Sequence, residues 1–340
     1  MGLVDFEKIE GIDGIILSNI VANAKDVKSA GRNRVAKKLK SKISFDDGKM
    51  GTWKSLKAGD KELHLHSVTA LLNGGRVFSS RAPGMVMGVG NTGEYLGEYN
   101  DGDLYISDDA GVTWTKTRDE AHMYEFGGSG SIIVAAYDEG MTKKVSYSKN
   151  HGKSWDDLDL GVEVRVKLLT TTPDSTSLKF LIIGTSKDKK THLIALDFNE
   201  VFDRQCKLDK NDLDKGDYEK WYARVDDDKK PDCLMGRKQF FYRRKKDADC
   251  SAGKLFEEPE AESEVCECQD QDFECDFNFV REDGKCVRAK GAKLPIPANE
   301  CKKPTDTYKG KSGYRKIPGN VCSGGKKLEE TVERKCTEGK

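Results

Sequence analysis

Residues 107–114 read Ser-Asp-Asp-Ala-Gly-Val-Thr-Trp (SDDAGVTW), and this stretch decides the fold of the first part of the chain. An alternating apolar run, Leu104–Ile106, leads into it. Asp109 can hold the turn backbone through its side chain, Gly111 can adopt a positive φ, and Trp114 can begin the next strand. The stretch therefore predicts a β-hairpin whose turn is fixed by its own side chains.

The same motif, Ser-x-[Asp/Asn]-x-Gly-x-[Ser/Thr]-Trp, occurs three times. Residues 148–155 (SKNHGKSW) form a copy with Asn for Asp and Ser for Thr, and residues 44–53 (SFDDGKMGTW) form one with two extra residues before the Trp. The three tryptophans lie 61 and then 41 residues apart, which is typical of β-propeller blades. The structural residues of the two regular copies are Ser107, Asp109, Gly111, Thr113, Trp114, Ser148, Asn150, Gly152, Ser154 and Trp155.

Further strands are expected between and after these copies. The candidates are Met85–Val89, Ser131–Tyr137, Lys179–Ile183 and Leu193–Phe198. Almost no stretch sustains the 3.6-residue period of an amphipathic helix. Residues 1–205 are therefore predicted to be all-β and to form about three to four blades of a β-propeller.

The second part of the chain is marked by its cysteines, because the first 205 residues contain none. The ten are Cys206, Cys233, Cys250, Cys266, Cys268, Cys275, Cys286, Cys301, Cys322 and Cys336. This part is poor in large aliphatic residues, so apolar burial alone cannot offset its chain entropy. Disulfides, each contributing roughly 2–4 kcal/mol, are the usual compensation in an oxidising compartment. Residues 206–340 are thus predicted to be a disulfide-rich module with five disulfides.

A zinc site is the alternative interpretation of the cysteines. Zinc sites use two close cysteine pairs at a regular offset. Here the closest pair is Cys266 and Cys268, and no histidine follows His192. Disulfides are therefore favoured, and no metal or other cofactor is expected.

The charge balance and the apolar pattern exclude several classes of partner. Lys+Arg and Asp+Glu both number 58, so no net field attracts nucleic acid or an anionic membrane. Apolar runs reach only about seven residues, whereas a membrane span needs roughly 20. Asp5, Glu7 and Glu10 stand where a signal peptide is basic. A disulfide-rich chain without an export signal is expected to be a luminal fragment of a longer protein.

For two stretches whose side chains could bind a ligand or a metal, we favour a structural role. The basic residues between Lys25 and Lys42 are interpreted as a solvated loop rather than a nucleic-acid or membrane patch. His64 and His66 share one face of a strand, as metal ligands can, but no third ligand is identifiable.

Three more stretches are charged. The acidic runs 209–214 and 270–276 resemble calcium loops but lack the required glycine, so solvated loops are preferred. Residues 237–246 (RKQFFYRRKK) combine basic and aromatic side chains, as some nucleic-acid surfaces do. Because this run lies between Cys233 and Cys250, a β-hairpin with packed aromatic rings and solvated charges is favoured.

The motifs together resemble a known family. The stretches that carry the likeness are residues 85–96 (MVMGVGNTGEYL), 105–114, 125–134 (EFGGSGSIIV), 231–250 (PDCLMGRKQFFYRRKKDADC), 266–279 (CECQDQDFECDFNF) and 313–322 (GYRKIPGNVC). They are similar to the luminal domain of sortilin-type vacuolar protein sorting receptors, particularly the fungal ones. The Asp-box turn (the repeated motif above) is weak evidence alone, since unrelated propellers use it. The cysteine order is strong evidence.

The resemblance implies a ten-bladed propeller, two cysteine-rich subdomains, a transmembrane helix and a cytosolic tail. This chain corresponds to the last blades and both subdomains, and it ends before any span. Carried over by order, the family's disulfides would be Cys206–Cys250, Cys233–Cys266, Cys268–Cys322, Cys275–Cys286 and Cys301–Cys336. About four blades cannot close such a ring, so exposed sheet edges and self-association are expected.

The function implied by the resemblance is the luminal ligand-binding region of a sorting receptor in the Golgi and endosome. It would capture soluble hydrolase precursors or peptides, and it would contact the remaining propeller blades of the parent chain. No nucleic-acid partner is expected, and the chain would be attached to the membrane only through a span that this sequence does not contain. Its ligand-binding residues are unknown. A secreted sialidase-like glycoside hydrolase is the alternative, but no Phe-Arg-Ile-Pro signature is present, so an enzyme is not expected. A purely structural extracellular module is a third possibility.

Overall fold

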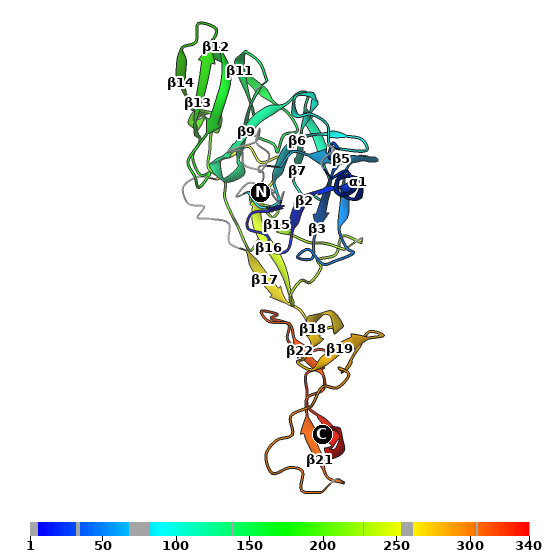
Figure 1. Cartoon of the computed structure of the whole chain (residues 1–340). Coiled ribbons are helices and arrows are strands. Elements are labelled where there is room, and N and C mark those ends of the chain that lie inside the picture. Colours follow the sequence, from blue (N-terminus) through cyan, green and yellow to red (C-terminus); the bar gives the residue numbers. More distant parts are fainter. Residues whose placement is uncertain are drawn as a thin grey trace. The chain divides into compact units, whose positions relative to one another are not determined.

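The computed structural model describes residues 6–31, 35–67, 82–137, 139–226, 228–252, 261–303 and 305–339. Strands dominate these residues (Figure 1). They form two compact units, the first within Met1–Ala223 and Phe240–Glu262 and the second within Arg224–Gln239 and Ser263–Lys340. The predicted division between residues 205 and 206 remains a prediction.

The first unit begins with an eight-stranded antiparallel sheet in which every strand pairs with its neighbours in sequence. Its strands are β1 (Phe6–Lys8), β2 (Ile16–Val21), β3 (Leu39–Ser44), β4 (Lys54–Ala58), β5 (Lys61–Leu65), β6 (Val86–Thr92), β7 (Asp103–Ser107) and β8 (Thr115–Arg118). This order is the up-and-down meander of propeller blades.

A six-stranded sheet follows, in the order β14-β13-β12-β11-β10-β9 (teal to green in Figure 1). Its strands are β9 (His122–Gly127), β10 (Ile132–Tyr137), β11 (Thr142–Ser148), β12 (Asp156–Thr170), β13 (Lys179–Ser186) and β14 (Thr191–Asp197). The long strand β12 pairs mainly through its first half with β11 and through its second half with β13.

The Asp-box turns occupy equivalent places in this meander. They connect β3 to β4, β7 to β8, and β11 to β12, which are the third and fourth strands of three successive sets of four. The four further strands predicted between and after the copies of the motif coincide with β6, β10, β13 and β14, so these predictions are confirmed. The predicted fold class, a partial propeller with a disulfide-rich part, is confirmed as well.

Burial explains why these segments pair. In β10 five consecutive residues are buried, as expected for a strand with both faces covered, whereas β14 alternates exposed and covered positions. Three apolar clusters fill the first unit, and Leu63, Met87 and Ile182 at their centres have no exposed surface.

The basic segment after β2 differs from its predicted loop. Ala24–Ser29 form a short helix, α1, in which no residue is buried. Residues 32–34, which contribute two of the predicted basic side chains, lie outside the described residues.

A third sheet has the strand order β15-β16-β17, with β15 (Tyr218–Tyr222), β16 (Arg237–Arg244) and β17 (Glu262–Val265). Within the first unit, residues Phe240–Arg244 of β16 pair antiparallel with β15. The predicted hairpin within residues 237–246 is therefore wrong, because Arg237–Arg244 form one strand, which pairs with β15 from earlier in the chain and with β17 from later in it.

The second unit contains short, two-stranded sheets. They pair β18 (Phe273–Cys275) with β22 (Tyr314–Lys316), β19 (Phe279–Glu282) with β20 (Lys285–Arg288), and β21 (Thr307–Gly310) with β23 (Val332–Lys335). Its two small apolar clusters each contain three buried residues, and cysteines supply three of the six: Cys268 and Cys322 in one, Cys286 in the other. So little apolar burial leaves the disulfides as a main constraint on this unit.

Candidate functional site

The complete Asp-box turn is built as a closed set of hydrogen bonds. The Asp109 carboxylate accepts hydrogen bonds from the backbone N–H of Thr113 (2.8 Å), the Thr113 hydroxyl (2.6 Å) and the Ser107 hydroxyl (2.7 Å). Ser107 Oγ accepts the N–H of Gly111 at 2.8 Å, and Trp114 Nε1 donates to the Gly111 carbonyl at 3.1 Å. All these side chains are used within the turn, so their role is structural.

Gly111 is required at its position for two reasons. Its φ is +89°, which side chains rarely adopt, and a Cβ there would stand 2.5 Å from Ile43 Cδ1. The turn therefore packs directly onto β3 of the preceding set of strands.

The other two copies show how the motif varies. In the third copy, the Asn150 side chain accepts the Ser154 N–H at 3.0 Å and donates to the Ser154 hydroxyl at 2.8 Å. In the first copy, Asp46 accepts the Thr52 hydroxyl at 2.8 Å. The hydrogen bond between the Asp and Thr side chains is thus kept, although this turn is two residues longer.

The ten cysteines form five disulfides. The pairs are Cys206–Cys250, Cys233–Cys266, Cys268–Cys322, Cys275–Cys286 and Cys301–Cys336. Their Cα–Cα distances run from 5.0 to 6.6 Å, within the range that a disulfide spans. These are the pairs that the resemblance implies.

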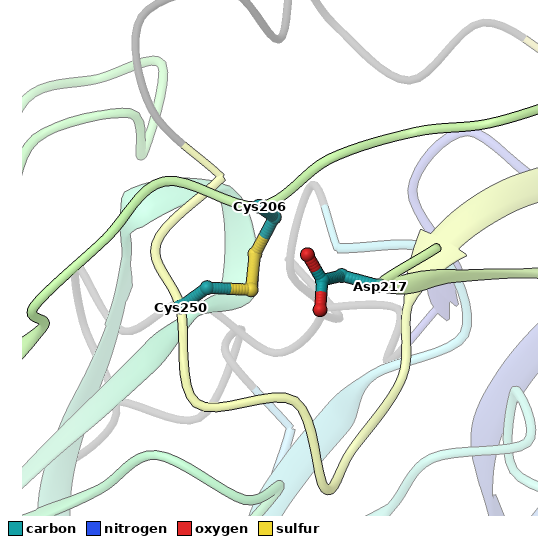
Figure 2. Close-up of side chains that lie close together, drawn as sticks. All are labelled: Cys206, Asp217 and Cys250. Carbon is teal, nitrogen blue, oxygen red and sulfur yellow. A yellow bond between two sulfur atoms is a disulfide. The ribbon is translucent and has the colours of Figure 1, made fainter. Parts of the chain in front are cut away.

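One disulfide lies beside a carboxylate in an arrangement that resembles a metal site. Figure 2 shows Asp217 facing the Cys206–Cys250 pair. Only a thiolate binds a metal strongly, and both sulfur atoms here are bonded to each other. Asp217 is held by the Arg204 guanidinium at 2.6 and 2.7 Å, which lowers the pKa of this carboxyl to about 2. This cluster is an ion pair beside a disulfide.

The basic end of β16 was predicted to be solvated, and for two arginines this is wrong. The side chain of Arg244 is 5% exposed, and that of Arg243 is 13% exposed. Arg244 donates to the carbonyl oxygens of Lys149 (2.7 Å), Ser131 (3.4 Å) and Ala248. The predicted packing of the aromatic rings is confirmed, since Phe240 and Phe241 are buried.

Arg243 connects β16 to the Asp-box turn that precedes β8. Its Nε donates to Glu219 at 2.7 Å, its Nη1 donates to the carbonyl oxygen of Asp108, and the guanidinium lies 4.5 Å from the centre of the Trp221 ring. Burial lowers the pKa of its neighbour Arg244 to about 10. Both arginines thus use their charge to fix backbone carbonyls within the first unit.

A buried histidine completes this basic cluster. His151, 7% exposed, lies in the third Asp-box turn, and its Nδ1 is 3.7 Å from the Asp108 carboxylate. The histidine ring, followed by Arg243, lowers the pKa of Asp108 to about 2, while burial lowers the pKa of His151 itself. The contact network therefore includes residues beyond the predicted motif residues. His151 and Asp108 occupy positions at which the Asp-box motif allows any residue, so the motif did not identify them.

A polar groove of about 540 Å³ lies along the ends of β8 to β12. Arg118, Lys144 and Tyr137 line it together with the acidic residues Asp119 and Asp157. Lys144 is bonded to Asp157 at 3.4 Å, and the Arg118 guanidinium stacks 5.4 Å from the Trp155 ring. A surface with both signs of charge and an aromatic edge suits an extended peptide better than a highly charged ligand.

The paired histidines have structural roles. Nδ1 of the buried His64 ring accepts a hydrogen bond from the Ser41 N–H at 3.1 Å. The other ring nitrogen, Nε2, lies 3.1 Å from the carbonyl oxygen of Gly93. Burial lowers the pKa of His64, and His66 packs edge-on against Tyr99. Both rings are therefore used in strand packing.

The acidic runs also serve local structure. Asp209 accepts the N–H groups of Asn211 and Asp212, and Asp272 accepts the N–H of Gln269 at 2.7 Å and the Asn320 amide at 2.7 Å. These carboxylates hold turns together. Among the described residues, no helix combines the length and the apolar surface needed to cross a bilayer.

Asp-box sheets joined to a segment braced by five disulfides define a class of partial β-propeller with a disulfide-rich module, and the comparisons agree. A family model described as "Sortilin, neurotensin receptor 3" matches residues 1–169, and one described as "Sortilin, neurotensin receptor 3, C-terminal" matches residues 171–336. The chain belongs to the Sortilin-Vps10 family.

Curated fungal relatives match almost the whole chain. The "Vacuolar protein sorting/targeting protein 10" of Coccidioides posadasii (strain C735) is 54% identical over 345 residues, and that of Blastomyces gilchristii (strain SLH14081) is 55% identical over 348 residues. The protein of the same name from Paracoccidioides brasiliensis (strain Pb03) is 54% identical over 347 residues. Each match covers 99% of this chain and 22% of the relative's own length. Their names describe protein sorting rather than catalysis.

Proposed function

We propose that this chain is a luminal part of a vacuolar sorting receptor that captures soluble hydrolase precursors or peptides in the Golgi for delivery to the endosome and vacuole. The observation that carries the proposal is the identity of more than half of all residues with fungal sorting proteins across 99% of the chain. The chain spans about a fifth of those relatives (22%), so its share of the work is one region of a larger receptor.

The groove beside β11 is the candidate contact for cargo within this region. It is open and polar, and it offers both donors and acceptors to an extended peptide segment. Neighbouring residues of β11 provide a matched pair of variants, because Lys144 lines the groove whereas the exposed Lys143 is not among its lining residues.

The function can be tested in a fungal strain without its own receptor. A chimera places this chain in the matching segment of the Coccidioides relative, and the secreted fraction of a vacuolar hydrolase is measured. We expect the chimera to return the hydrolase to the vacuole. A chimera that reaches the same membranes at the same level, yet leaves the hydrolase secreted, would contradict the proposal.

The groove is tested in the same chimera. We expect Lys144→Glu to increase hydrolase secretion several-fold and Lys143→Glu to leave sorting unchanged. Equal sorting by both variants would remove the groove from the proposal while leaving the receptor function intact.

A further inference from the structure

Strand β14 ends the six-stranded sheet and is the most accessible edge of the two large sheets in the first unit. Within the described residues it pairs with β13 alone. The other edges of the two large sheets are less suited to pairing: β1 and β8 have three and four residues, and five of the six residues of β9 are buried. An edge strand presents unpaired N–H and C=O groups, which can pair with another strand.

The direction of these groups follows from the pairing with β13. The Lys190 carbonyl accepts the Ser186 N–H at 3.0 Å, and the Phe198 N–H donates to Leu178 at 3.0 Å. The register between them has no shift, so the even-numbered residues bond inward to β13. The odd-numbered residues, 191, 193, 195 and 197, therefore direct their N–H and C=O groups outward.

The side chains on the outer positions are unusually apolar for an edge. Leu193 is 70% exposed, and Ala195 beside it is also exposed. Leu181 on β13 and Leu168 on β12, which are 37% and 38% exposed, extend this apolar surface inward. Residues 192–196 contain no Lys, Asp, Glu or Pro, the residues that commonly protect an edge.

The charges flanking β14 are complementary to each other. The turn before the strand, Lys187-Asp188-Lys189-Lys190, has three lysines, whereas Asp197, Glu200 and Asp203 lie at its end and beyond. In an antiparallel pair of identical strands, the basic start of one lies against the acidic end of the other. The existing ion pairs, Lys190–Asp188 and Lys179–Asp197, are solvent-exposed and thus weak, so they can rearrange at little cost.

We propose that two copies of this chain associate by antiparallel pairing of β14 with β14, about a two-fold axis at Ile194. This register places Leu193 opposite Ala195 of the second copy and Thr191 opposite its Asp197. All four outward-facing residues then find partners, and within β14 no like charges stand opposite one another. Because the two edges cover each other, the pairing closes at a dimer. The proposal does not depend on the cargo or on the sorting function.

The full chain, produced in an oxidising host, is examined by sedimentation at increasing concentration. We expect a monomer of 37.9 kDa in equilibrium with a species of twice that mass. Ala195→Pro removes an outward N–H without removing a bond to β13, and Leu193→Lys adds a charge to the edge. Both variants should raise the dimer dissociation constant at least ten-fold.

Leu181→Lys is the matched control, because Leu181 lies on the same apolar surface but one strand away from the edge. We expect this variant to dimerise as the unmodified chain does. If Leu181→Lys disrupts association as strongly as Leu193→Lys, the copies stack through their faces and edge pairing is wrong. A strict monomer, or an open-ended series of larger species, would also overturn the proposal.

A charge exchange tests the antiparallel direction. One variant carries Lys189→Glu and Lys190→Glu, and the other carries Asp197→Lys and Glu200→Lys. We expect each alone to dimerise at least ten-fold more weakly than the unmodified chain and the mixture to recover part of the affinity. A mixture that associates no better than its components would exclude the proposed register.

Discussion

Arg244 on strand β16 donates a hydrogen bond of 2.7 Å to the carbonyl oxygen of Lys149, which lies 95 residues earlier at the start of the third Asp-box turn. The same guanidinium also binds the carbonyls of Ser131 and Ala248. A single buried side chain thus satisfies backbone groups from three separate segments. Such groups are costly when they are left unpaired.

Replacing this arginine should weaken the first unit. We expect Arg244→Met to lower the free energy of unfolding by about 2–4 kcal/mol, since it leaves buried carbonyl groups without a donor. The measurement is urea denaturation followed by tryptophan fluorescence. Arg165→Met is the control: this arginine is on the exposed surface, 3.8 Å from Glu139, and its loss should change stability by less than about 0.5 kcal/mol. Equal effects would contradict the role assigned to Arg244.

The predictability of this network differs between its parts. The sequence predicted the Asp-box turns, because Ser107, Asp109 and Gly111 form a local pattern in which every contact is only a few residues away. It also predicted strands such as β10 and β13 from their apolar runs. Local patterns carry that information directly.

The role of Arg244 could not be predicted in this way. Its partners lie 95 and 113 residues away, and they are backbone carbonyls, which every residue possesses. Nothing in the composition of residues 237–246 distinguishes a solvated arginine from one that is covered by the fold. The misassigned hairpin has the same origin, since β16 pairs with β15 and β17, which both lie outside residues 237–246.

The Asp-box carboxylates should contribute unequally to stability. Asp109 accepts a backbone N–H and two hydroxyl groups, whereas Asp46 accepts only hydroxyls, those of Thr52 and Ser44. We expect Asp109→Ala to cost about 1–2 kcal/mol and Asp46→Ala to cost under about 1 kcal/mol, because a lost backbone partner is left unsatisfied. Thermal unfolding of the two variants in one buffer gives the comparison. A larger loss for Asp46→Ala would show that the longer turn depends on contacts other than these.

A buried carboxyl group should make stability depend on pH. Glu125 is 7% exposed and accepts the Phe126 N–H at 3.0 Å, and burial raises its pKa from 4.5 to about 7. In the unfolded chain the group loses its proton near pH 4.5, while the folded chain keeps it until about pH 7. Its contribution to stability is therefore greatest at low pH and declines as pH rises from 4.5 to 7.

Glu125→Gln should abolish this dependence, because the amide stays neutral. We expect the unmodified chain to lose about 1–3 kcal/mol relative to the variant between pH 5 and pH 8. Denaturation curves at both pH values measure the difference, and Glu120→Gln, at an exposed position, serves as the control. A constant difference between the unmodified chain and Glu125→Gln across this range would show that Glu125 keeps an ordinary pKa.

Disulfide loss should affect the second unit according to loop length. Cys268 and Cys322 are separated by 54 positions in the sequence and Cys275 and Cys286 by only 11, and restricting the longer loop removes more entropy from the unfolded chain. The loop-entropy relation gives roughly 4 kcal/mol for the first disulfide and roughly 3 kcal/mol for the second. Because Cys268 and Cys322 also form the buried cluster with Phe273, their removal has an added packing cost.

We therefore expect the double variant Cys268→Ser/Cys322→Ser to make the second unit sensitive to protease, whereas Cys275→Ser/Cys286→Ser keeps most of its resistance. Mass analysis of the unreduced digest provides the control, since the four remaining pairs must be unchanged in each variant before the two are compared. A greater loss of protease resistance in Cys275→Ser/Cys286→Ser would contradict this prediction. It would mean that packing of the cluster formed by Phe279, Cys286 and Leu294 contributes more to the stability of this unit than the loop entropy does.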